Sequence, residues 1–346
     1  MTKTALLTGT TGQDGSYLSE FLLNKGYKVY GIVRRSSTPN RQNISHFIDH
    51  KNFLPIYGDL TDGSSILQAI QDVQPDEIYN LGAQSDVHIS FDIPINTGNV
   101  NALGVIRILD CIKSLELWDC KFYQASTSEL FGKVRETPQT EETPFYPRSP
   151  YGVAKLYGYW AVKNYRESYP FFGCNGILFN HESPLRGENF VTRKVTKGLA
   201  EMYSMDRKEP LELGNLDAKR DWGHAADYVR GMWLMLQQNK ADDYILATGE
   251  THSIREMIEV CFDHLGDTIT WNGKGKNEKG YNGKGDLVIK VNPDFYRPAE
   301  VDLLLGDPSK AEKKLGWERS YTFKTLIKEM IETDINNLFR KPHLYM

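Results

Sequence analysis

A tyrosine and a lysine four positions apart are the first residues whose types and spacing could carry chemistry. Tyr151 and Lys155 lie in the segment Ser149-Pro-Tyr-Gly-Val-Ala-Lys155. Ser149 is a suitable N-cap and Pro150 suits the first helical position, so Tyr151 and Lys155 would share one face of a helix. A tyrosine acts as a base near neutral pH only if its pKa falls from about 10. A nearby ammonium favours the phenolate, so the pair predicts an acid–base centre.

A glycine-rich turn near the start of the chain could hold a pyrophosphate. The apolar run Leu6-Leu7-Thr8 leads into Gly9-Thr-Thr-Gly12-Gln-Asp-Gly15, and an amphipathic segment follows. Glycines let the backbone approach phosphates closely, and the next helix offers free N–H groups and a positive dipole end. The spacing is not Gly-x-Gly-x-x-Gly, and a plain strand-to-helix turn is the alternative, but the flanking strand and helix favour a dinucleotide site. The candidate cofactor residues of this turn are Gly9, Thr11, Gly12, Gln13, Asp14 and Gly15.

The residues after the second predicted strand bear on the choice of cofactor. An acidic residue there binds the ribose 2′-hydroxyl of NAD, whereas the 2′-phosphate of NADP needs arginine. Residues 30–36 read YGIVRRS, without a carboxylate, and Arg34 and Arg35 offer bidentate contacts to a phosphate. NADP is therefore the predicted cofactor. Asp59 and Leu60, after the third strand, stand where an adenine would lie, although Asp59 would serve equally well as a helix cap.

Composition and charge exclude several classes of protein. The 346 residues are 40% hydrophobic and 25% charged, which excludes a disordered or collagen-like chain. With 41 basic against 45 acidic residues the net charge is −4, so no global field would attract nucleic acid or an anionic membrane. Four cysteines and eight histidines show no metal-ligand spacing and no disulfide framework. Because no apolar run is typical of a signal peptide or a membrane span, we expect a cytoplasmic protein without a metal site.

Short apolar runs alternate with helical patterns through the first half of the chain. Leu18, Phe21 and Leu22, for example, have helical spacing before a stop at Gly26. Such alternation predicts an α/β fold of the Rossmann type, a doubly wound parallel sheet with helices on both faces. The predicted strands are Ala5–Thr8, Val29–Val33, Phe53–Tyr57, Glu77–Leu81, Phe122–Ala125 and Gly176–Phe179.

The pattern changes after about Asn180, where loops lengthen and prolines appear. The helix Asp227–Leu236 and the strand Tyr244–Ala247 are predicted to return to the sheet. Trp271–Gly285, rich in glycine and lysine, is predicted to be an exposed loop, since it lacks the interleaved aromatic residues of a nucleic-acid-binding patch. The expected division is an NADP-binding Rossmann domain over 1–183, to which 218–250 return, and a smaller α/β substrate lobe over 184–217 and 251–346.

Together, the glycine turn and the Tyr-x-x-x-Lys pair resemble the extended short-chain dehydrogenase/reductases that modify nucleotide sugars. Residues 79–85 (YNLGAQS) resemble the segment at that family's fourth strand, and residues 124–132 (QASTSELFG) the segment at its fifth. Longer strings, spread over nearly the whole chain, are similar to the GDP-mannose 4,6-dehydratase family. These strings are FYPRSPY (145–151), NGILFNHESP (175–184), FVTRK (190–194), RDWGH (220–224) and RPAEV (297–301).

The resemblance implies that Thr127, Glu129, Tyr151 and Lys155 are catalytic. A C4 epimerase of this superfamily needs a tyrosine and a serine or threonine. A 4,6-dehydratase must also remove the C5 proton and lose the C6 hydroxyl, which requires a further acid–base group. If the strand alternation continued past Ser126, Glu129 would point to the same face as Thr127 and could be that group. A capping or surface glutamate is the alternative interpretation.

The mechanism built on these residues is a hypothesis. Tyr151 takes the proton from O4 of the mannose while the C4 hydride passes to NADP, and Lys155 keeps the phenolate accessible and holds the nicotinamide ribose. Thr127 orients O4, and Glu129 removes the C5 proton as the C6 hydroxyl leaves as water. The hydride then returns to C6, so the cofactor should stay bound. The product would be GDP-4-keto-6-deoxy-D-mannose, a precursor in GDP-fucose or GDP-rhamnose synthesis.

The resemblance also implies the remaining contacts with cofactor and substrate. Further cofactor residues would be Leu81, Gly82, Ala83, Gln84, Ser85, Lys155, His181 and Arg186. Substrate residues would be Ser85, Ser126, Asn180, Val191, Lys194, Arg220, Arg297 and Glu300, with Arg186 and Arg193 as further candidates. A guanidinium matches a phosphate well, so Arg220 and Arg297 are the preferred diphosphate ligands, and Glu300 could accept hydrogen bonds from a ribose diol. We interpret His224 as a structural histidine.

The resemblance further implies self-association, as a dimer or a tetramer. The family associates through the helix after Asn99 and the helix that carries Tyr151, and its tetramers also through the Arg34-Arg35 loop. Apolar residues with partly helical spacing after Asn99 fit such an interface, or equally a core helix. They are Leu103, Ile106, Leu109, Ile112, Leu115 and Leu117.

Other functions stay open. An NADP-dependent nucleotide-sugar epimerase or reductase would have no use for Glu129. A non-catalytic NADP-sensing regulator typically loses one of the catalytic residues, whereas here all four are intact. The enzyme could also reduce its own keto product when NADPH is supplied, and the sequence does not decide this.

Overall fold

A parallel sheet of seven strands forms the larger part of the molecule. The computed structural model describes residues 2–38, 40–205, 207–295 and 304–339. The strand order is β11-β6-β5-β4-β1-β2-β3, and every neighbouring pair is parallel. The strands are β1 (Thr4–Thr8), β2 (Lys28–Val33), β3 (Phe53–Tyr57), β4 (Glu77–Asn80), β5 (Lys121–Ala125), β6 (Gly173–Leu178) and β11 (Tyr244–Leu246). The predicted Rossmann-type sheet is confirmed, with small differences at the strand ends.

Helices cover both faces of this sheet, as its two cores show. Leu7 belongs to a core that includes Leu18 and Met232, whereas the adjacent Leu6 belongs to another that includes Ile70 and Ile108. Successive side chains of a strand therefore point to opposite, equally buried faces, and the predicted double winding is confirmed. The first face carries α1 (Gln13–Asn24) and α8 (Ala225–Leu236), and the second α2 (Gly63–Val73), α5 (Gly104–Ser114) and α6 (Pro150–Ser168).

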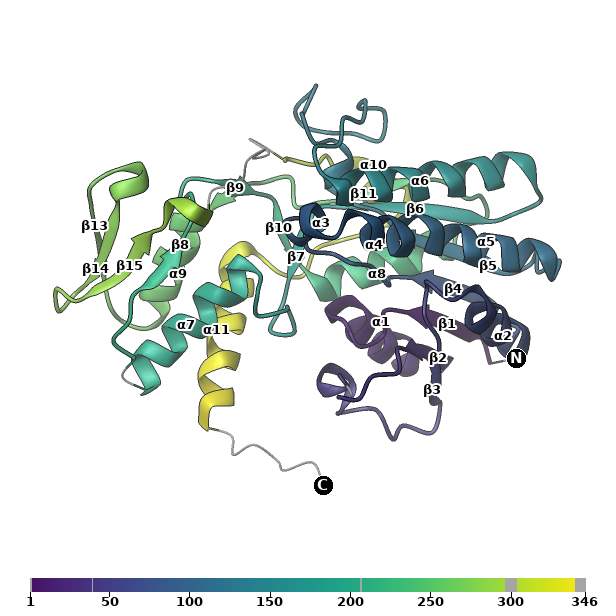
Figure 1. Cartoon of the computed structure of the whole chain (residues 1–346), viewed down its shortest axis with the longest axis horizontal. Coiled ribbons are helices and arrows are strands. Elements are labelled where there is room, and N and C mark those ends of the chain that lie inside the picture. Colours follow the sequence, from purple (N-terminus) through teal and green to yellow (C-terminus); the bar gives the residue numbers. More distant parts are fainter. Residues whose placement is uncertain (1, 39, 206, 296–303, 340–346) are drawn as a thin grey trace.

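A smaller body lies beyond the carboxyl ends of the strands, at the left of Figure 1. It contains a four-stranded sheet of order β13-β14-β15-β8 and its own buried core. Its strands are β8 (Leu211–Leu213), β13 (Ile269–Asn272), β14 (Lys279–Asn282) and β15 (Leu287–Val291), and its helices α7 (Val191–Met205), α9 (Ile254–His264) and α11 (Phe323–Phe339). Two short ladders complete the sheets: β7 (Asn180–Glu182) with β10 (Trp222–His224), and β9 (Lys219–Arg220) with β12 (His252–Ser253).

Short helical segments connect these elements. They are α3 (Ile89–Asp92), α4 (Pro94–Gly98), the π-helical turn η2 (Asn99–Leu103), and the 3₁₀ turns η1 (Gln42–Ile44), η3 (Ser128–Leu130), η4 (Gly275–Asn277) and η5 (Pro293–Phe295). Within the parts of the chain that the structure describes, no helix combines the length and the apolar character needed to cross a lipid bilayer.

We propose the division of the chain into a Rossmann domain over 1–183 and 218–250 and a lobe over 184–217 and 251–346, with one refinement. The helix α10 (Ser309–Leu315) belongs by sequence to the second segment of the lobe. Its Ala311 and Leu315 nevertheless lie in the core of the large sheet. We therefore assign α10 to the Rossmann domain.

The prediction of a loop over Trp271–Gly285 is wrong. This segment contains the end of β13, the turn η4 and the whole of β14, and β13 pairs with β14 as an antiparallel hairpin. A Cβ at Gly280 would lie 2.8 Å from Cζ3 of Trp271, so the glycine makes room for the indole. The glycine that suggested a loop is thus a packing requirement inside a strand.

Candidate active site

The glycine turn between β1 and α1 leaves no room for side chains. Gly9 has a φ of +69°, and a Cβ there would lie 2.7 Å from the backbone nitrogen of Gly82, after β4. A Cβ on Gly15 would lie 2.2 Å from the Gly9 carbonyl oxygen. The N-cap of α1 is Gly12, and it makes no side-chain capping bond. The first N–H groups of α1 are therefore not capped by a side chain there, which suits a phosphate ligand.

The side chains of the same turn tie α1 to β7. Asp14 Oδ2 lies 2.8 Å from Nε2 of His181, whose Nδ1 lies 2.8 Å from the Phe179 carbonyl oxygen. Both ring nitrogens thus face acceptors, which favours the imidazolium. Burial opposes both charges, but the pairing prevails: the pKa of Asp14 is lowered and that of His181 is raised. Gln13 is engaged similarly, since its Oε1 accepts a 2.8 Å bond from Ser183. What Gln13 and Asp14 offer a cofactor is therefore chiefly their backbone.

Arginines gather beyond the carboxyl ends of β2 and β3. Arg34 and Arg35 are exposed, and the Arg35 guanidinium lies 5.8 Å from the ring centroid of Tyr57. Arg41, which the sequence analysis missed, donates a 3.3 Å bond to the Tyr57 hydroxyl. Its place could not be read from the strand pattern, because Arg41 returns to Tyr57 through a long connection. The nearby Asn43 donates to the Thr11 carbonyl at 3.1 Å and so fastens this connection to the glycine turn.

The loops after β3 and β4 meet beside the glycine turn. A Cβ at Gly82 would lie 2.9 Å from Cδ1 of Leu60, so these two predicted cofactor residues are in close contact. The Asp59 carboxylate accepts bonds from the backbone N–H and the hydroxyl of Thr61, and Asp62 is the residue that caps α2. The alternative interpretation of Asp59 as a helix cap is therefore wrong, because Asp62 caps α2.

The segment after β4 is held by Asn101 of η2, the turn that leads into α5. The backbone N–H of Gln84 donates to the Asn101 side chain at 2.9 Å, and the Asn101 amide returns a bond of 2.8 Å to the Gln84 carbonyl. Leu81 and Ala83 are half-buried beside it, and Ser85 is exposed. The segment predicted to line the cofactor site is thus fixed by a paired backbone–amide contact.

Tyr151 and Lys155 share one face of α6, as predicted, and that face is buried. Ser149 caps the helix through a 3.0 Å bond from the Gly152 N–H, and Pro150 occupies the first turn. Tyr151 and Lys155 are 8% and 5% exposed. Lys155 Nζ donates a 2.9 Å bond to the Ala125 carbonyl at the end of β5 and lies 5.8 Å from the centroid of the Tyr151 ring.

The electrostatics of the pair differ from the sequence-based expectation. Burial raises the pKa of Tyr151 to about 12, a hydrogen bond with Thr127 lowers it, and the Glu129 carboxylate raises it further. Burial also lowers the pKa of Lys155 to about 8. The expectation of a lowered Tyr151 pKa is wrong for the protein alone, because burial outweighs the hydrogen bond with Thr127 and the charge of Arg186. With a pKa of about 12, Tyr151 is a neutral phenol at neutral pH.

Thr127 and Glu129 reach the site by a different route from the one predicted. The strand β5 ends at Ala125, and Thr127 is the N-cap of η3, accepting a 3.2 Å bond from the Glu129 N–H. The expectation that strand alternation would continue to Glu129 is therefore wrong. Both residues still act on Tyr151, Thr127 through a hydrogen bond that lowers its pKa and Glu129 through a charge that raises it.

Two predicted substrate residues carry polar atoms without partners. Among the described residues, Ser126 Oγ and Asn180 Oδ1 are buried and make no hydrogen bond. Ser126 follows β5, and Asn180 begins β7, beside Trp222 of β10. Buried polar atoms normally find partners, so these two are available for a hydrogen bond with a ligand.

The remaining candidate substrate residues differ in their burial and in their contacts. Lys194, on α7, lies 4.2 Å from the centroid of the Phe295 ring, and burial lowers its pKa. Arg220, on β9, is half-exposed. Arg186 pairs with Glu182 at 3.1 Å. Val191 is half-buried at the start of α7. Arg297 and Glu300 lie outside the described residues.

Arg193 cannot serve the diphosphate. It is 7% exposed and its guanidinium is paired with Asp334 of α11, while its Nε donates to the Arg186 carbonyl at 3.2 Å. The candidate role of Arg193 as a diphosphate ligand is therefore wrong. His224 is structural, as interpreted: it is buried and its Nδ1 caps α8 by accepting a bond from Ala226 N–H.

The sheet, the glycine turn and the buried Tyr-x-x-x-Lys pair together define an extended short-chain dehydrogenase/reductase. A dTDP-glucose 4,6-dehydratase from Bacillus anthracis, solved in complex with NAD, has the same fold, with a TM-score of 0.81 at 21% identity over 97% of each chain. Residues 6–330 match the family model described as GDP-mannose 4,6 dehydratase. The chain belongs to this family.

Individual members of the family are similar over almost their whole length. The GDP-mannose 4,6 dehydratase of Drosophila melanogaster is 55% identical over 348 aligned residues, which cover 98% of this chain and 88% of the relative. The enzyme of the same name from Homo sapiens is 54% identical, with 98% and 93% covered.

Proposed function

We propose that this protein is a nucleotide-sugar 4,6-dehydratase, a hydro-lyase that converts GDP-D-mannose into GDP-4-keto-6-deoxy-D-mannose and water. The observation that carries the proposal is that the buried Thr127 and the half-buried Glu129 both act on the pKa of the buried Tyr151, in a chain 54% identical to the human GDP-mannose 4,6 dehydratase. An epimerase at C4 or a reductase would need Thr127 and Tyr151 but would give Glu129 no task.

NADP is the cofactor we propose, and the residues present fit it. The glycine turn and the uncapped start of α1 suit the pyrophosphate, and Arg34, Arg35 and Arg41 supply cations where the 2′-phosphate of the adenosine ribose would lie. We assign Asp59, Leu60 and the segment 81–85 to its adenosine side and centre, and His181 and Arg186 to its nicotinamide end. When bound, the cofactor accepts the hydride from C4 and returns it to C6.

Tyr151 takes the proton from O4 of the sugar in this proposal. Burial keeps Tyr151 neutral, so its ionisation requires added positive charge, and an oxidised nicotinamide carries one. Lys155 adds an ammonium held at the Ala125 carbonyl, and Thr127 donates to the developing oxyanion and orients O4. The nicotinamide, Lys155 and Thr127 thus all favour a negative charge that exists only while O4 loses its proton.

Glu129 removes the C5 proton in the proposed second step. The C4 ketone makes that proton acidic, and the carboxylate lies near enough to Tyr151 to influence its pKa. The C6 hydroxyl leaves as water, and the same carboxyl group can protonate it as it departs; when the hydride returns to C6, C5 takes up one proton from solvent or Tyr151, which balances the proton taken from O4. Glu129 thus acts first as base and then as acid, which explains why a dehydratase needs one group more than an epimerase.

The substrate would lie between the two bodies of the molecule. The orphaned atoms of Ser126 and Asn180 suit hydroxyl or phosphate groups of the substrate, and Lys194 and Arg220 offer positive charge for the diphosphate. Ser85 and Val191, with Arg297 and Glu300, complete the proposed set. The preference for guanine rests on the family alone.

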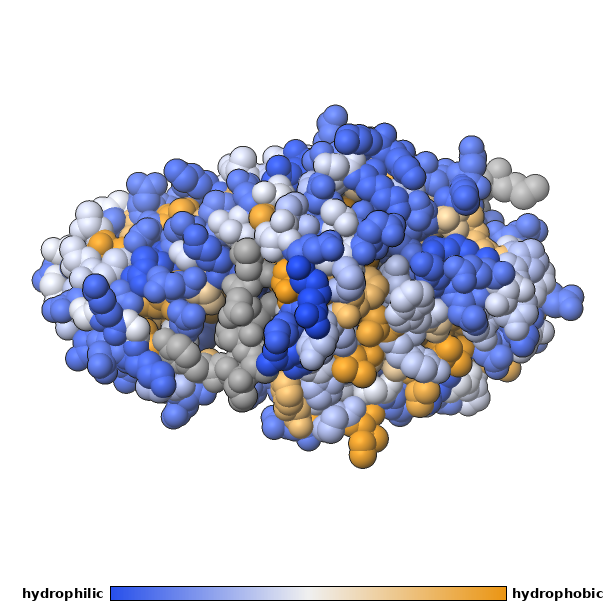
Figure 2. Space-filling model, turned by 90° about the horizontal axis from the view of Figure 1, so that it is seen from above, coloured by the Kyte–Doolittle hydropathy of each residue, from blue (hydrophilic) through white to orange (hydrophobic). Residues whose placement is uncertain are grey.

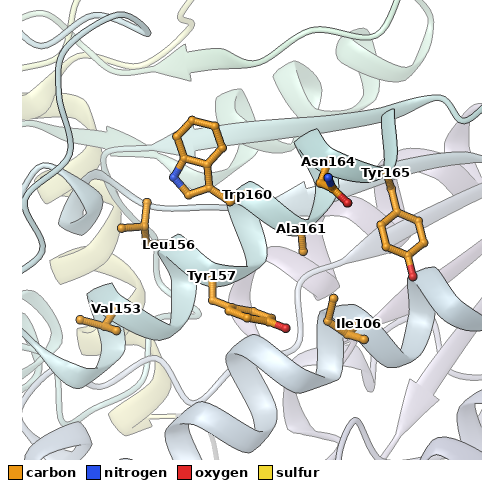
Figure 3. A pocket seen from close by; sticks show the side chains of 8 residues that line it. All are labelled: Ile106, Val153, Leu156, Tyr157, Trp160, Ala161, Asn164 and Tyr165. Carbon is orange, nitrogen blue, oxygen red and sulfur yellow. The ribbon is translucent and has the colours of Figure 1, made fainter. Parts of the chain in front are cut away.

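We also propose that the protein self-associates through α5 and α6. On the outer face of α6, Val153, Tyr157 and Trp160 are half exposed, at 56%, 50% and 50%. Figure 3 shows these side chains together with Ile106 of α5 around one hollow. Figure 2, which views the molecule from above Figure 1, shows apolar residues close together to the right of the centre. Exposed apolar groups of this density are typical of an interface. Leu109 and Ile112, by contrast, belong to the core.

Three finer points belong to the same proposal. A cytoplasmic location and a role in supplying GDP-fucose or GDP-rhamnose agree with the proposed reaction. The reduction of the keto product at C4 is chemically available to Tyr151 when NADPH is supplied. Incubation of that product with excess NADPH tests it, and the absence of any 6-deoxy sugar with a C4 hydroxyl excludes it.

The direct test of the function is conversion of GDP-mannose by the purified protein, followed by mass spectrometry. We expect the loss of one water per sugar nucleotide, without consumption of added NADPH. UDP-glucose and dTDP-glucose serve as control substrates and should remain unchanged. An unchanged mass of GDP-mannose in the presence of NADP⁺ would contradict the proposal.

A further inference from the structure

A chain of buried hydrogen bonds crosses the carboxyl ends of three strands and stops at the carbonyl that holds Lys155. We propose that Gln124, supported by Asn80, is a positioning residue for Lys155, because its amide fixes the Ala125 carbonyl to which the lysine donates. This inference rests on the proposed dehydratase chemistry, in which Lys155 assists Tyr151.

Three side chains form the chain of bonds. Thr8, Asn80 and Gln124 stand side by side in the parallel ladder of β1, β4 and β5, and each is at most 2% exposed. Thr8 Oγ1 donates to Asn80 Oδ1 at 2.6 Å, and Asn80 Nδ2 donates to Gln124 Oε1 at 2.8 Å. Gln124 Nε2 then donates to the Ala125 oxygen at 2.9 Å, and Lys155 Nζ donates to the same oxygen at 2.9 Å.

The order of donors fixes how both amides are turned. The Thr8 hydroxyl accepts a 2.8 Å bond from the Gly82 N–H, so its own proton points to Asn80. Asn80 then presents its oxygen to Thr8 and its NH₂ group to Gln124, and Gln124 presents its NH₂ group to Ala125. The opposite orientation of Gln124 would set its oxygen against the Ala125 oxygen. The bonds therefore run in one direction, and each strengthens the next.

The contact between Gln124 and the Ala125 carbonyl affects the charge of Lys155. This side chain is 5% exposed, and burial already lowers its pKa to about 8. A carbonyl oxygen that accepts a bond from the ammonium favours the charged form. The two donors share one oxygen, so the contribution of Gln124 is the direction in which it holds the Ala125 carbonyl, and without its amide that carbonyl is no longer held toward Lys155. The ammonium would then be lost at a lower pH, and Tyr151 would lose the assistance of its charge.

The test replaces Gln124 by methionine, which fills similar space without an amide. The pKa of Lys155 is read from the pH dependence of its ε-carbon NMR signal in protein carrying isotope-labelled lysine, assigned by comparison with Lys155→Met. In Gln124→Met we expect this pKa to fall by about half a unit or more. We also expect kcat for GDP-mannose to fall about tenfold with KM unchanged, and the alkaline limb of kcat to move to lower pH.

A matched control lies on the next strand. Asn175 pairs with Gln124 in the β5–β6 ladder and is fully buried, but its amide donates to Asp243 at 3.0 Å. Asn175→Leu should leave the pKa of Lys155 and the alkaline limb unchanged, even where it lowers the melting temperature. Asn80→Leu, one bond further from the lysine, should also lower the pKa of Lys155, but by less than Gln124→Met does. If Gln124→Met does not fold, this second variant tests the positioning role.

Different results contradict the positioning role of Gln124 and the proposed function. An unchanged pKa of Lys155 in Gln124→Met overturns the positioning role, and so does an equal shift in Asn175→Leu. Failure of the unsubstituted protein to convert GDP-mannose instead overturns the proposed function. The NMR titration needs no turnover, so it tests the contact between Gln124 and the lysine anchor in either case.

Discussion

Asp14, at the start of α1, and His181, on β7, form an ion pair in which Oδ2 and Nε2 lie 2.8 Å apart. The pair joins the glycine turn to the strand that begins with Asn180. It thereby holds the proposed phosphate-binding turn and the proposed sugar-binding strand in one fixed relation. The stacked ring of Tyr228, with its centroid 4.5 Å from that of His181, supports the histidine from α8.

Asp14→Asn should destabilise the protein in a pH-dependent way. The pKa of Asp14 is lowered, so its contribution is present above the unfolded value of about 4 and is lost as the pH falls through the folded value. The pKa of His181 is raised, so its contribution is complete below about 6.5 and is lost as the pH rises through the folded value. In denaturant titrations, the free energy of unfolding of Asp14→Asn should be about 2 kcal/mol lower than that of the unsubstituted protein at any pH between 4 and 6.5. The difference should be smaller at higher pH. A loss that is constant from pH 5 to 9 would contradict the ion pair.

Glu129→Gln should stop dehydration without preventing oxidation at C4. The amide cannot accept the C5 proton, so the 4-keto hexose should accumulate with NADPH bound, and absorbance near 340 nm should rise and persist. In D₂O the unsubstituted enzyme should place deuterium at C5, whereas this variant should not. Glu142→Gln, an exposed glutamate on the preceding connection to α6, is the matched control and should behave as the unsubstituted enzyme. Undiminished water loss by Glu129→Gln would remove Glu129 from the mechanism.

Replacing Arg34 and Arg35 together by serine should change the cofactor preference. Guanidinium–phosphate bonds are strong and charge-assisted, so the Kd for NADP should rise about tenfold or more, whereas the Kd for NAD should change little. Isothermal titration with both cofactors measures the two constants. Lys51→Ala, on the exposed surface before β3, should affect neither. An equal rise in Kd for both cofactors would show that the arginines do not contact the 2′-phosphate.

Much of the fold and the outline of the site could be predicted from the sequence. The seven strands follow from apolar runs, and the cap of α6 follows from Ser149 and Pro150, because these signals are local. The hairpin over β13 and β14 was missed because Gly280 marks a packing contact with Trp271, which only the fold reveals.

Features that depend on distant contacts could not be predicted. Arg193 is indistinguishable from a ligand until α11 brings Asp334 to it. The path of the chain to Glu129 depends on where β5 ends, which the pattern after Ala125 does not fix. The rise of the Tyr151 pKa follows from burial, and burial is a property of the assembled site.

Trp160→Glu should weaken self-association while preserving the fold. Trp160 is half exposed on α6, so a charge there costs the monomer little but would be desolvated in an interface. Sedimentation velocity should show a smaller species at concentrations where the unsubstituted protein is a dimer or tetramer. Glu167→Lys, two turns further along α6, is exposed beside a different cavity and should not change the sedimentation coefficient. An unchanged assembly in Trp160→Glu would place the interface elsewhere.

Internal return of one hydride is the central claim, and a tracer measures it directly. GDP-mannose deuterated at C4 is mixed with unlabelled GDP-mannose and converted by the purified protein with unlabelled NADPH present. The account predicts that each labelled molecule loses one water and carries its own deuterium at C6, with no transfer to the unlabelled product. Retention of the full substrate mass, or the appearance of the label in the added cofactor instead of at C6, would contradict it.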